Sequence, residues 1–140
     1  MKKKKVSKIR LLPDDPYIVI GLSCNDNDYR VSWDLNKLLG LRLTKESNHI
    51  FLNSKAAEQS HSQYTFVDEE SGMRYYLLAN KSDEGYILEQ YRNIDFFIQI
   101  VGKTNAAELD SILSALKRSD IISAAFQIPI QNIKAGMMPY

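Results

Sequence analysis

The chain has 140 residues, 44% of them hydrophobic, and a formal net charge of +1. This length suits one domain that buries about two-thirds of its unfolded surface. The near-zero charge creates no general attraction for nucleic acid, the single cysteine excludes an intramolecular disulfide, and no apolar run approaches the roughly 18 residues that span a bilayer. We therefore expect a cytoplasmic protein with no nucleic-acid partner and no membrane contact.

The composition divides the chain into three segments. Residues 1–12 are basic and are expected to be partly mobile, residues 13–129 to form a single α+β domain, and residues 130–140 to form a loose C-terminal tail. Within the first segment, an edge strand is allowed by three apolar residues, Val6, Ile9 and Leu11.

The first predicted elements are a strand and a helix. β-Branched residues after Pro16 predict a strand over residues 17–22. The polar cluster at residues 25–28 supplies a cap for a helix over residues 28–41, and Gly40 suits the end of that helix. Its core-facing stripe is expected at Val31, Leu35, Leu38 and Leu39.

The same helix carries a second apolar face. Tyr29 and Trp33 lie one turn apart, at about 160° and 200° from Val31, on the side that a simple surface helix gives to water. Arg30 and Lys37 flank them, as the polar rim of an interface does. Either a later segment of the chain covers these aromatic side chains or another protein does, and the sequence leaves both alternatives open.

Residues 44–62 have the weakest pattern in the chain. A short strand is expected over residues 50–52 and a polar linker over residues 53–62. This region and the C-terminal tail are the candidates within the chain to cover Tyr29 and Trp33.

The following runs are typical of a sheet. Alternating residues over 62–68 and 73–80 predict a hairpin, and residues 81–85 predict a second turn. The strongest strand signal covers residues 94–101, where one face is expected to hold Ile94, Phe96, Ile98 and Ile100.

A second helix and a last strand complete the domain. Asn105 and Glu108 have the spacing of a capping box, apolar residues keep helical spacing up to Arg118, and residues 121–128 predict a strand. This order of elements predicts an antiparallel sheet with two helices on one face, in a ferredoxin-like or related split-βαβ plan.

Part of the first helix resembles a known family. The residues Asp28-Tyr29-Arg30, Trp33, Leu35-Asn36-Lys37 and Leu39-Gly40 resemble the signature Asp-Tyr-Arg-Leu-x-Trp-Glu-Leu-Asn-Lys of the uncharacterised bacterial IPExxxVDY family. The motif that names the family falls on residues 88–96, where Asp95 matches and Glu89 and Gln90 depart from the Pro-Glu pair. The resemblance covers most of the chain between Tyr17 and Phe126. It implies no activity, cofactor or catalytic residue.

No residue pattern typical of catalysis is present in the sequence. Cys24 has no histidine near it in the chain, and His49 and His61 lack zinc-ligand spacing. Asp95, within an apolar strand, is either an acceptor of backbone hydrogen bonds, which we favour, or a functional carboxylate. We predict no catalytic, cofactor-binding or metal-binding residue, and therefore a protein that is not an enzyme.

We expect a domain that acts through protein contacts. A homodimer is the simplest case, because the second apolar face of the sheet or of the first helix needs a cover, and the partner is otherwise unknown. The predicted interaction residues are Tyr29, Arg30, Trp33 and Lys37. The alternative is a small-molecule-sensing regulatory module with a ligand near the helix N-termini, at residues 25–28 or 103–105.

Overall fold

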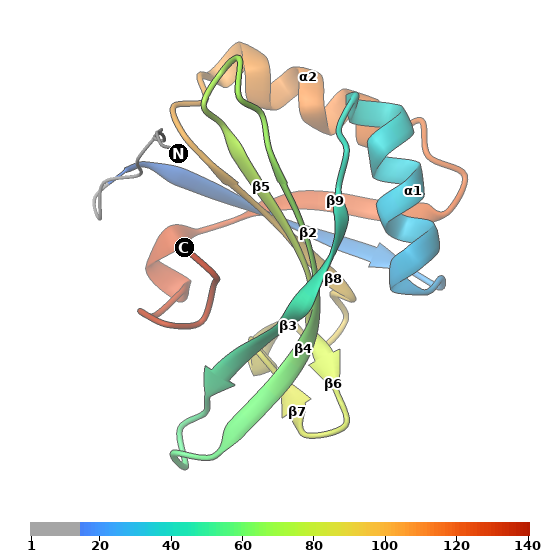
Figure 1. The fold of residues 1–140 in the computed structure, drawn as a ribbon. Helices are drawn as coiled ribbons and strands as arrows, with labels where there is room; N and C mark the ends of the chain where they lie inside the picture. The colour runs from blue at the N-terminus through green and yellow to red at the C-terminus, as the bar shows by residue number, and fades with distance from the viewer. Residues whose placement is uncertain (1–14) are drawn as a thin grey trace.

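The computed structural model describes residues 15–140. The basic segment 1–12, with the edge strand expected there, lies outside this range. The described residues form a six-stranded antiparallel sheet with two α-helices on one of its faces (Figure 1), so the predicted α+β class is confirmed. Among residues 15–140, no helix has the length and apolar character that crossing a membrane requires.

The elements follow one another through short connections. In chain order they are β2 (Tyr17–Cys24), α1 (Asp28–Leu39), β3 (Thr44–Leu52), β4 (Glu58–Val67), β5 (Arg74–Ala79), β6 (Lys81–Ser82), β7 (Gly85–Tyr86), the 3-10 turn η1 (Glu89–Tyr91), β8 (Phe96–Val101), α2 (Ala106–Leu116), β9 (Ile122–Ile128) and the 3-10 turn η2 (Ile130–Asn132).

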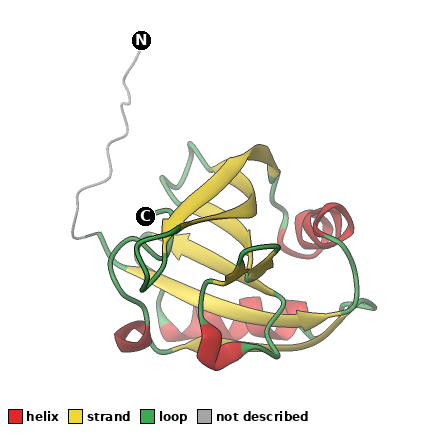
Figure 2. Cartoon of the chain, turned by 90° about the horizontal axis from the view of Figure 1, so that it is seen from below, coloured by secondary structure: helices red, strands yellow, loops and turns green. Residues whose placement is uncertain are grey.

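The strand order in the large sheet is β3-β4-β5-β8-β2-β9, and every neighbouring pair is antiparallel. It follows that β8 and β9 run in the same direction on either side of β2 and are joined through α2, which is a split βαβ arrangement. The three-stranded meander β3-β4-β5 extends the sheet beyond a ferredoxin-like plan, which is therefore not confirmed. Figure 2 shows that the sheet is strongly curved.

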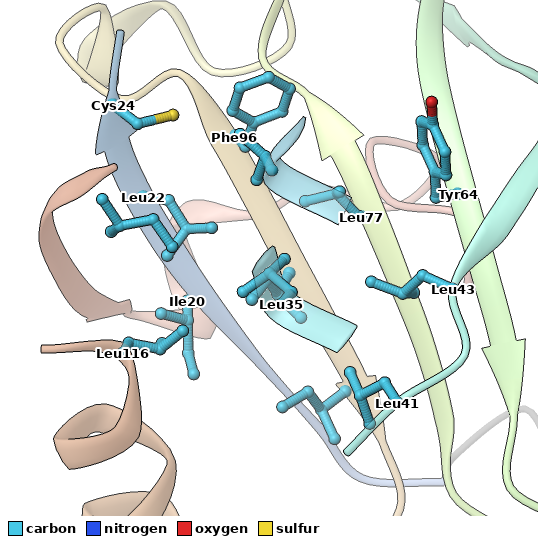
Figure 3. Close-up of a cluster of buried hydrophobic side chains, with 14 residues drawn as sticks. Ile20, Leu22, Cys24, Leu35, Leu41, Leu43, Tyr64, Leu77, Phe96 and Leu116 are labelled. Atoms are coloured by element: carbon cyan, nitrogen blue, oxygen red, sulfur yellow. The ribbon is translucent and has the colours of Figure 1, made fainter. Parts of the chain in front are cut away.

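The first hydrophobic core lies between the sheet and the two helices (Figure 3). Leu35 of α1 and Leu116 of α2 are fully buried in it. Alternate residues of the strands meet them, as the period of two along a β-strand requires. These strand residues are Ile20, Leu22, Tyr64, Leu77, Phe96, Ile98 and Ile100.

A second core lies on the opposite face of the sheet. It joins Phe97 of β8 to Leu88 and Ile94, which surround η1, and to Met138 near the C-terminus. Ile94 therefore lies on the other face from Phe96, so the prediction that they share a face was wrong. The reason is that β8 begins only at Phe96, after Asp95.

The C-terminal segment packs against this second face instead of forming a loose tail. Met138 is buried, the Tyr140 amide donates a hydrogen bond to Gln99 Oε1 at 3.1 Å, and the Tyr140 ring meets the edge of Tyr17. The second apolar face of the sheet is thus covered within the chain. This face of the sheet therefore gives no reason to expect a dimer. The expectation of a dimer now rests on the outer face of α1.

Residues 44–62 also differ from the prediction. They form the edge strand β3 and the first half of β4, paired from Thr44↔Thr65 to Leu52↔Glu58, so the linker expected over residues 53–62 is only a short turn. Asn53 stabilises this turn, because its side-chain oxygen accepts hydrogen bonds from the amides of Lys55 and Ala57. The other predicted strands and both helices are present at the expected places.

Candidate contact surface on helix α1

Helix α1 is held by caps at both ends. The Asn27 side chain accepts a hydrogen bond from the Arg30 amide at 2.9 Å, which satisfies one free donor of the first turn. Gly40 ends the helix in the left-handed conformation, with φ of 68°, where a side chain would be strained. Val31 and Leu35 are completely buried, so the inner face of the helix is fixed as predicted.

The outer face of α1 exposes two aromatic side chains. Tyr29 is 66% exposed and Trp33 is 58% exposed, the highest values among the large hydrophobic residues of the described chain apart from Leu52. Neither residues 44–62 nor the C-terminal segment covers them, because the first region forms β3 and β4 and the second packs on the opposite face of the sheet. The alternative that one of these two segments covers Tyr29 and Trp33 was therefore wrong.

Charged side chains surround the aromatic pair. Lys37 Nζ lies 4.7 Å from the centroid of the Trp33 ring, within the range of a cation–π interaction. Arg30 Nε is 3.3 Å from Asp26 Oδ2. On the side facing α2, Asp34 accepts a hydrogen bond from Ser119 Oγ at 2.6 Å. The four predicted interaction residues thus lie together on one exposed helix face with a mixed charged border.

A polar network ties the start of α1 to the β3–β4 hairpin. Asp28 Oδ2 accepts a hydrogen bond from the Ser62 hydroxyl and lies 3.7 Å from Lys45 Nζ, which also donates to Ser62 Oγ at 2.9 Å. Lys45 lies 5.3 Å from the ring centroid of Tyr64. Burial raises the pKa of the Tyr64 phenol, and the nearby Asp28 carboxylate adds to the effect. This network fixes the aromatic face of α1 relative to the edge of the sheet.

Beyond the network, the edge strand exposes two further apolar side chains. Ile50 and Leu52 are 52% and 63% exposed, and they pair with Ser60 and Glu58 of β4. Ser60 and Ser62 are neighbours on the same face of β4, since side chains alternate along a strand. The exposed apolar surface therefore occurs on both sides of the polar network, on α1 and on β3.

Cys24 and Asp95 have structural roles. Cys24 is buried, and burial raises the pKa of its thiol, which disfavours the reactive thiolate. The Cys24 amide donates to Asp95 Oδ2 at 2.8 Å, and the Asp95 amide donates to the Leu22 carbonyl at 2.8 Å. Asp95 thus continues the β2–β8 pairing past the end of the ladder, which agrees with the interpretation that we favoured.

The two histidines, far apart in the sequence, are brought together by the β3–β4 hairpin. His49 pairs directly with His61 across the strands. His49 Nε2 is 2.9 Å from the Met137 carbonyl oxygen, whereas His61 Nδ1 is 2.9 Å from the Ala79 carbonyl oxygen. Sequence reasoning missed this pair because it assigned residues 53–62 to a linker. Among residues 15–140, no group of three or more potential metal-binding side chains is found.

Asn80 was also missed from the sequence. It is fully buried, and its side chain makes four hydrogen bonds of 2.9–3.1 Å: the oxygen accepts from the amides of Ile87 and Leu88, and the nitrogen donates to the carbonyls of Tyr91 and Ile94. One side chain therefore organises the whole segment between β7 and β8. Its only sequence signal is a polar residue that ends an alternating run.

The helix N-termini, the alternative ligand sites, are occupied by their own side chains. Asn27 caps α1, and Asn105 with Glu108 forms the predicted capping box of α2, with hydrogen bonds of 2.8 and 2.9 Å. A shallow hollow of about 410 Å³ beside the start of α2 is lined by both basic and acidic residues, including Lys103 and Glu108. At each N-terminus the capping side chain therefore satisfies one amide of the first turn within the chain.

Comparison with known proteins identifies no relative, since no family model and no curated protein matches the chain.

Proposed function

We propose that this protein is a non-enzymatic domain that acts through protein contacts and self-associates through the outer face of α1. The observation that carries the proposal is the exposure of Tyr29 and Trp33, one helical turn apart on a rigid, doubly capped helix. Aromatic side chains on rigid elements are typical anchors of protein interfaces, because they bury a large area at little cost in conformational entropy.

A second copy of the chain is the occupant that best matches this face. In an antiparallel, two-fold pairing of α1 with itself, Tyr29 of one copy meets Trp33 of the other, as an isologous interface requires. The same pairing brings Lys37 of one helix towards Asp26 at the start of the other and sets the helix dipoles antiparallel. The net charge of +1 causes little repulsion between copies.

Two further proposals accompany this one. The resemblance to the IPExxxVDY family, and with it a bacterial origin, stays a proposal that rests on the residues of α1 and on Asp95. A cytoplasmic location is supported by the single cysteine, whose buried thiol suits a reducing compartment.

The test is the oligomeric state of the Trp33→Glu variant, measured by sedimentation velocity over a wide concentration range. We expect a wild-type dimer and a folded Trp33→Glu monomer, because the substitution removes the larger aromatic anchor of this face and places at its centre a charge that the dimer would have to desolvate. Ile130→Glu is the matched control: Ile130 is 43% exposed and lies in η2, away from α1, so that this variant should remain dimeric. A wild-type protein that stays monomeric at the highest concentration, or a dimeric Trp33→Glu variant, would contradict the proposal.

A further inference from the structure

One hollow of the described structure lies on the face of the sheet opposite the helices. Its volume is about 550 Å³, within the range of small-molecule sites. It opens between β3, β4 and β5 and is closed on one side by the C-terminal segment. The lining includes His49, Gln63, Thr65, Arg74, Tyr76 and Pro139.

Arg74 is the only side chain of this lining with a buried and unpartnered nitrogen. Its Nε has no hydrogen-bond partner, although the side chain is only partly exposed. Arg74 also makes no ion pair with any carboxylate among residues 15–140. A buried donor on a permanently charged group is unfavourable unless an acceptor is supplied. Residues 15–140 supply no acceptor for this nitrogen.

A second unpartnered donor lies beside the first. Gln99 is fully buried, and its Nε2 has no partner, while its Oε1 accepts from the Tyr140 amide. Arg74 pairs with Val101 of β8, so Gln99 is its diagonal neighbour on the same face, at about 7–8 Å between backbone positions. Gln99 does not line the hollow itself, but its unpartnered amide lies on the same face of the sheet as Arg74.

The nearest acidic residue of the lining is remote from Arg74. Glu46 pairs with Gln63, whereas Arg74 pairs with Val67, four residues further along β4. At about 3.3 Å per residue these pairs are about 13 Å apart. Glu46 is therefore too far away to form an ion pair with Arg74, and Val67 and Pro139 add apolar surface to the lining.

We propose that this hollow binds the oxyanion group, carboxylate or phosphate, of a small molecule, with Arg74 as the anchor. The planar guanidinium presents Nε–H and a terminal N–H side by side, a geometry that matches two oxygens of one carboxylate or phosphate group. The Tyr76 and Thr65 hydroxyls in the lining supply further donors. The site is separate from the α1 surface, since it lies on the other face of the sheet.

The test is an NMR titration of the Arg74 Nε–H signal with three probes: inorganic phosphate, acetate and benzoate. The signal is assigned by its loss in Arg74→Lys. We expect it to move downfield and to saturate with at least one probe, with benzoate binding more tightly than acetate because of the apolar walls. Arg74→Lys keeps the charge and the aliphatic stem but loses the two parallel N–H donors of the guanidinium. It should weaken the affinity for the probe by at least about fivefold. The affinity of this variant is measured from the backbone amide signals of Thr65 and Tyr76.

Arg42→Gln is the matched control, since Arg42 is exposed and lies outside the hollow. It should respond to each probe as the wild type does, whereas Arg74→Gln should not respond. Saturation by phosphate alone assigns a phosphate ligand, and saturation by benzoate alone assigns a carboxylate. An Arg74 signal that no probe moves, or equal responses of the wild type and Arg74→Gln, would overturn the proposal.

Discussion

The polar residues at the two ends of β5 differ in whether their buried atoms have hydrogen-bond partners. Asn80, directly after the strand, uses its whole side-chain amide in four hydrogen bonds, whereas Arg74, at the start, leaves a buried nitrogen without a partner. Both lie on the face opposite the helices. The comparison teaches that burial alone says little about the role of a polar residue. A buried polar group whose hydrogen bonds are all made within the chain indicates a structural role. A buried polar group without a partner indicates a position at which a ligand can supply one.

The largest effect on stability is expected at Asn80, after the end of β5. Asn80→Leu keeps the approximate volume but leaves buried backbone groups of Leu88 and Ile94 without this partner, and should lower the free energy of unfolding by about 3 kcal/mol. Urea unfolding followed by circular dichroism measures the change. Asn93→Leu, at an exposed position whose side chain makes no hydrogen bond among the described residues, should change stability by less than about 0.5 kcal/mol. Equal effects of the two substitutions would show that the hydrogen bonds of the Asn80 side chain do not stabilise the fold.

His61 is an intermediate case. It is fully buried, and its two ring nitrogens face the Ala79 carbonyl and Gln59 Oε1, at 2.9 and 3.1 Å. Burial lowers the pKa of His61 below its usual value, an effect that His49 reinforces and that the Ala79 hydrogen bond and the Glu84 charge oppose. In its neutral form the ring carries one N–H and donates to only one of these two oxygens.

This lowered pKa predicts a dependence of stability on pH. The unfolded chain binds a proton at His61 near pH about 6.5, before the folded protein does, so stability is highest above this pH and falls as the pH drops through it. His61→Gln should lose less stability than the wild type between about pH 7.5 and 5.5. Thermal unfolding at both pH values measures the difference. If the His49→Gln control loses the dependence and His61→Gln retains it, the assignment to His61 is wrong.

The smallest effect on stability is expected at Arg74, at the start of β5. Arg74→Met removes a partly buried charge that has no partner in the described chain and keeps most of the aliphatic stem, so stability should stay within about 0.5 kcal/mol or rise. Urea unfolding of the unliganded protein checks this. A loss as large as that of Asn80→Leu would mean that Arg74 is structural after all.

The parts of the fold predicted from the sequence are those with strong local patterns. Both helices, the hairpin that turns at Gly72 and the strands β2, β8 and β9 follow from periodicity and capping residues. The short strand predicted over residues 50–52 is the end of β3. The rest of β3 and the first half of β4 were missed because their residues are polar on both faces, so no alternation of apolar and polar side chains marks them. The packing of Met138 depends on a core to which five strands contribute, β2, β3, β5, β8 and β9, and no local pattern reveals such a surface.

The candidate surfaces follow the same division. Tyr29 and Trp33 were found because a helical wheel places them opposite Val31 and Leu35. The His49–His61 pair and the Arg74–Gln99 donors were not found, since their proximity depends on strand register. A one-residue shift in register would move each of these side chains to the other face.

The position of Trp33 also determines what light can report about this protein. It is the single tryptophan of the sequence, and more than half of its side chain is exposed in the folded chain. In the monomer, its fluorescence should therefore change little when the domain unfolds, because much of the indole is in contact with water in both states. A partner that binds to the outer face of α1 would shift the Trp33 emission to shorter wavelength. Intrinsic fluorescence, usually a measure of folding, is here an unlabelled signal for the arrival of a partner.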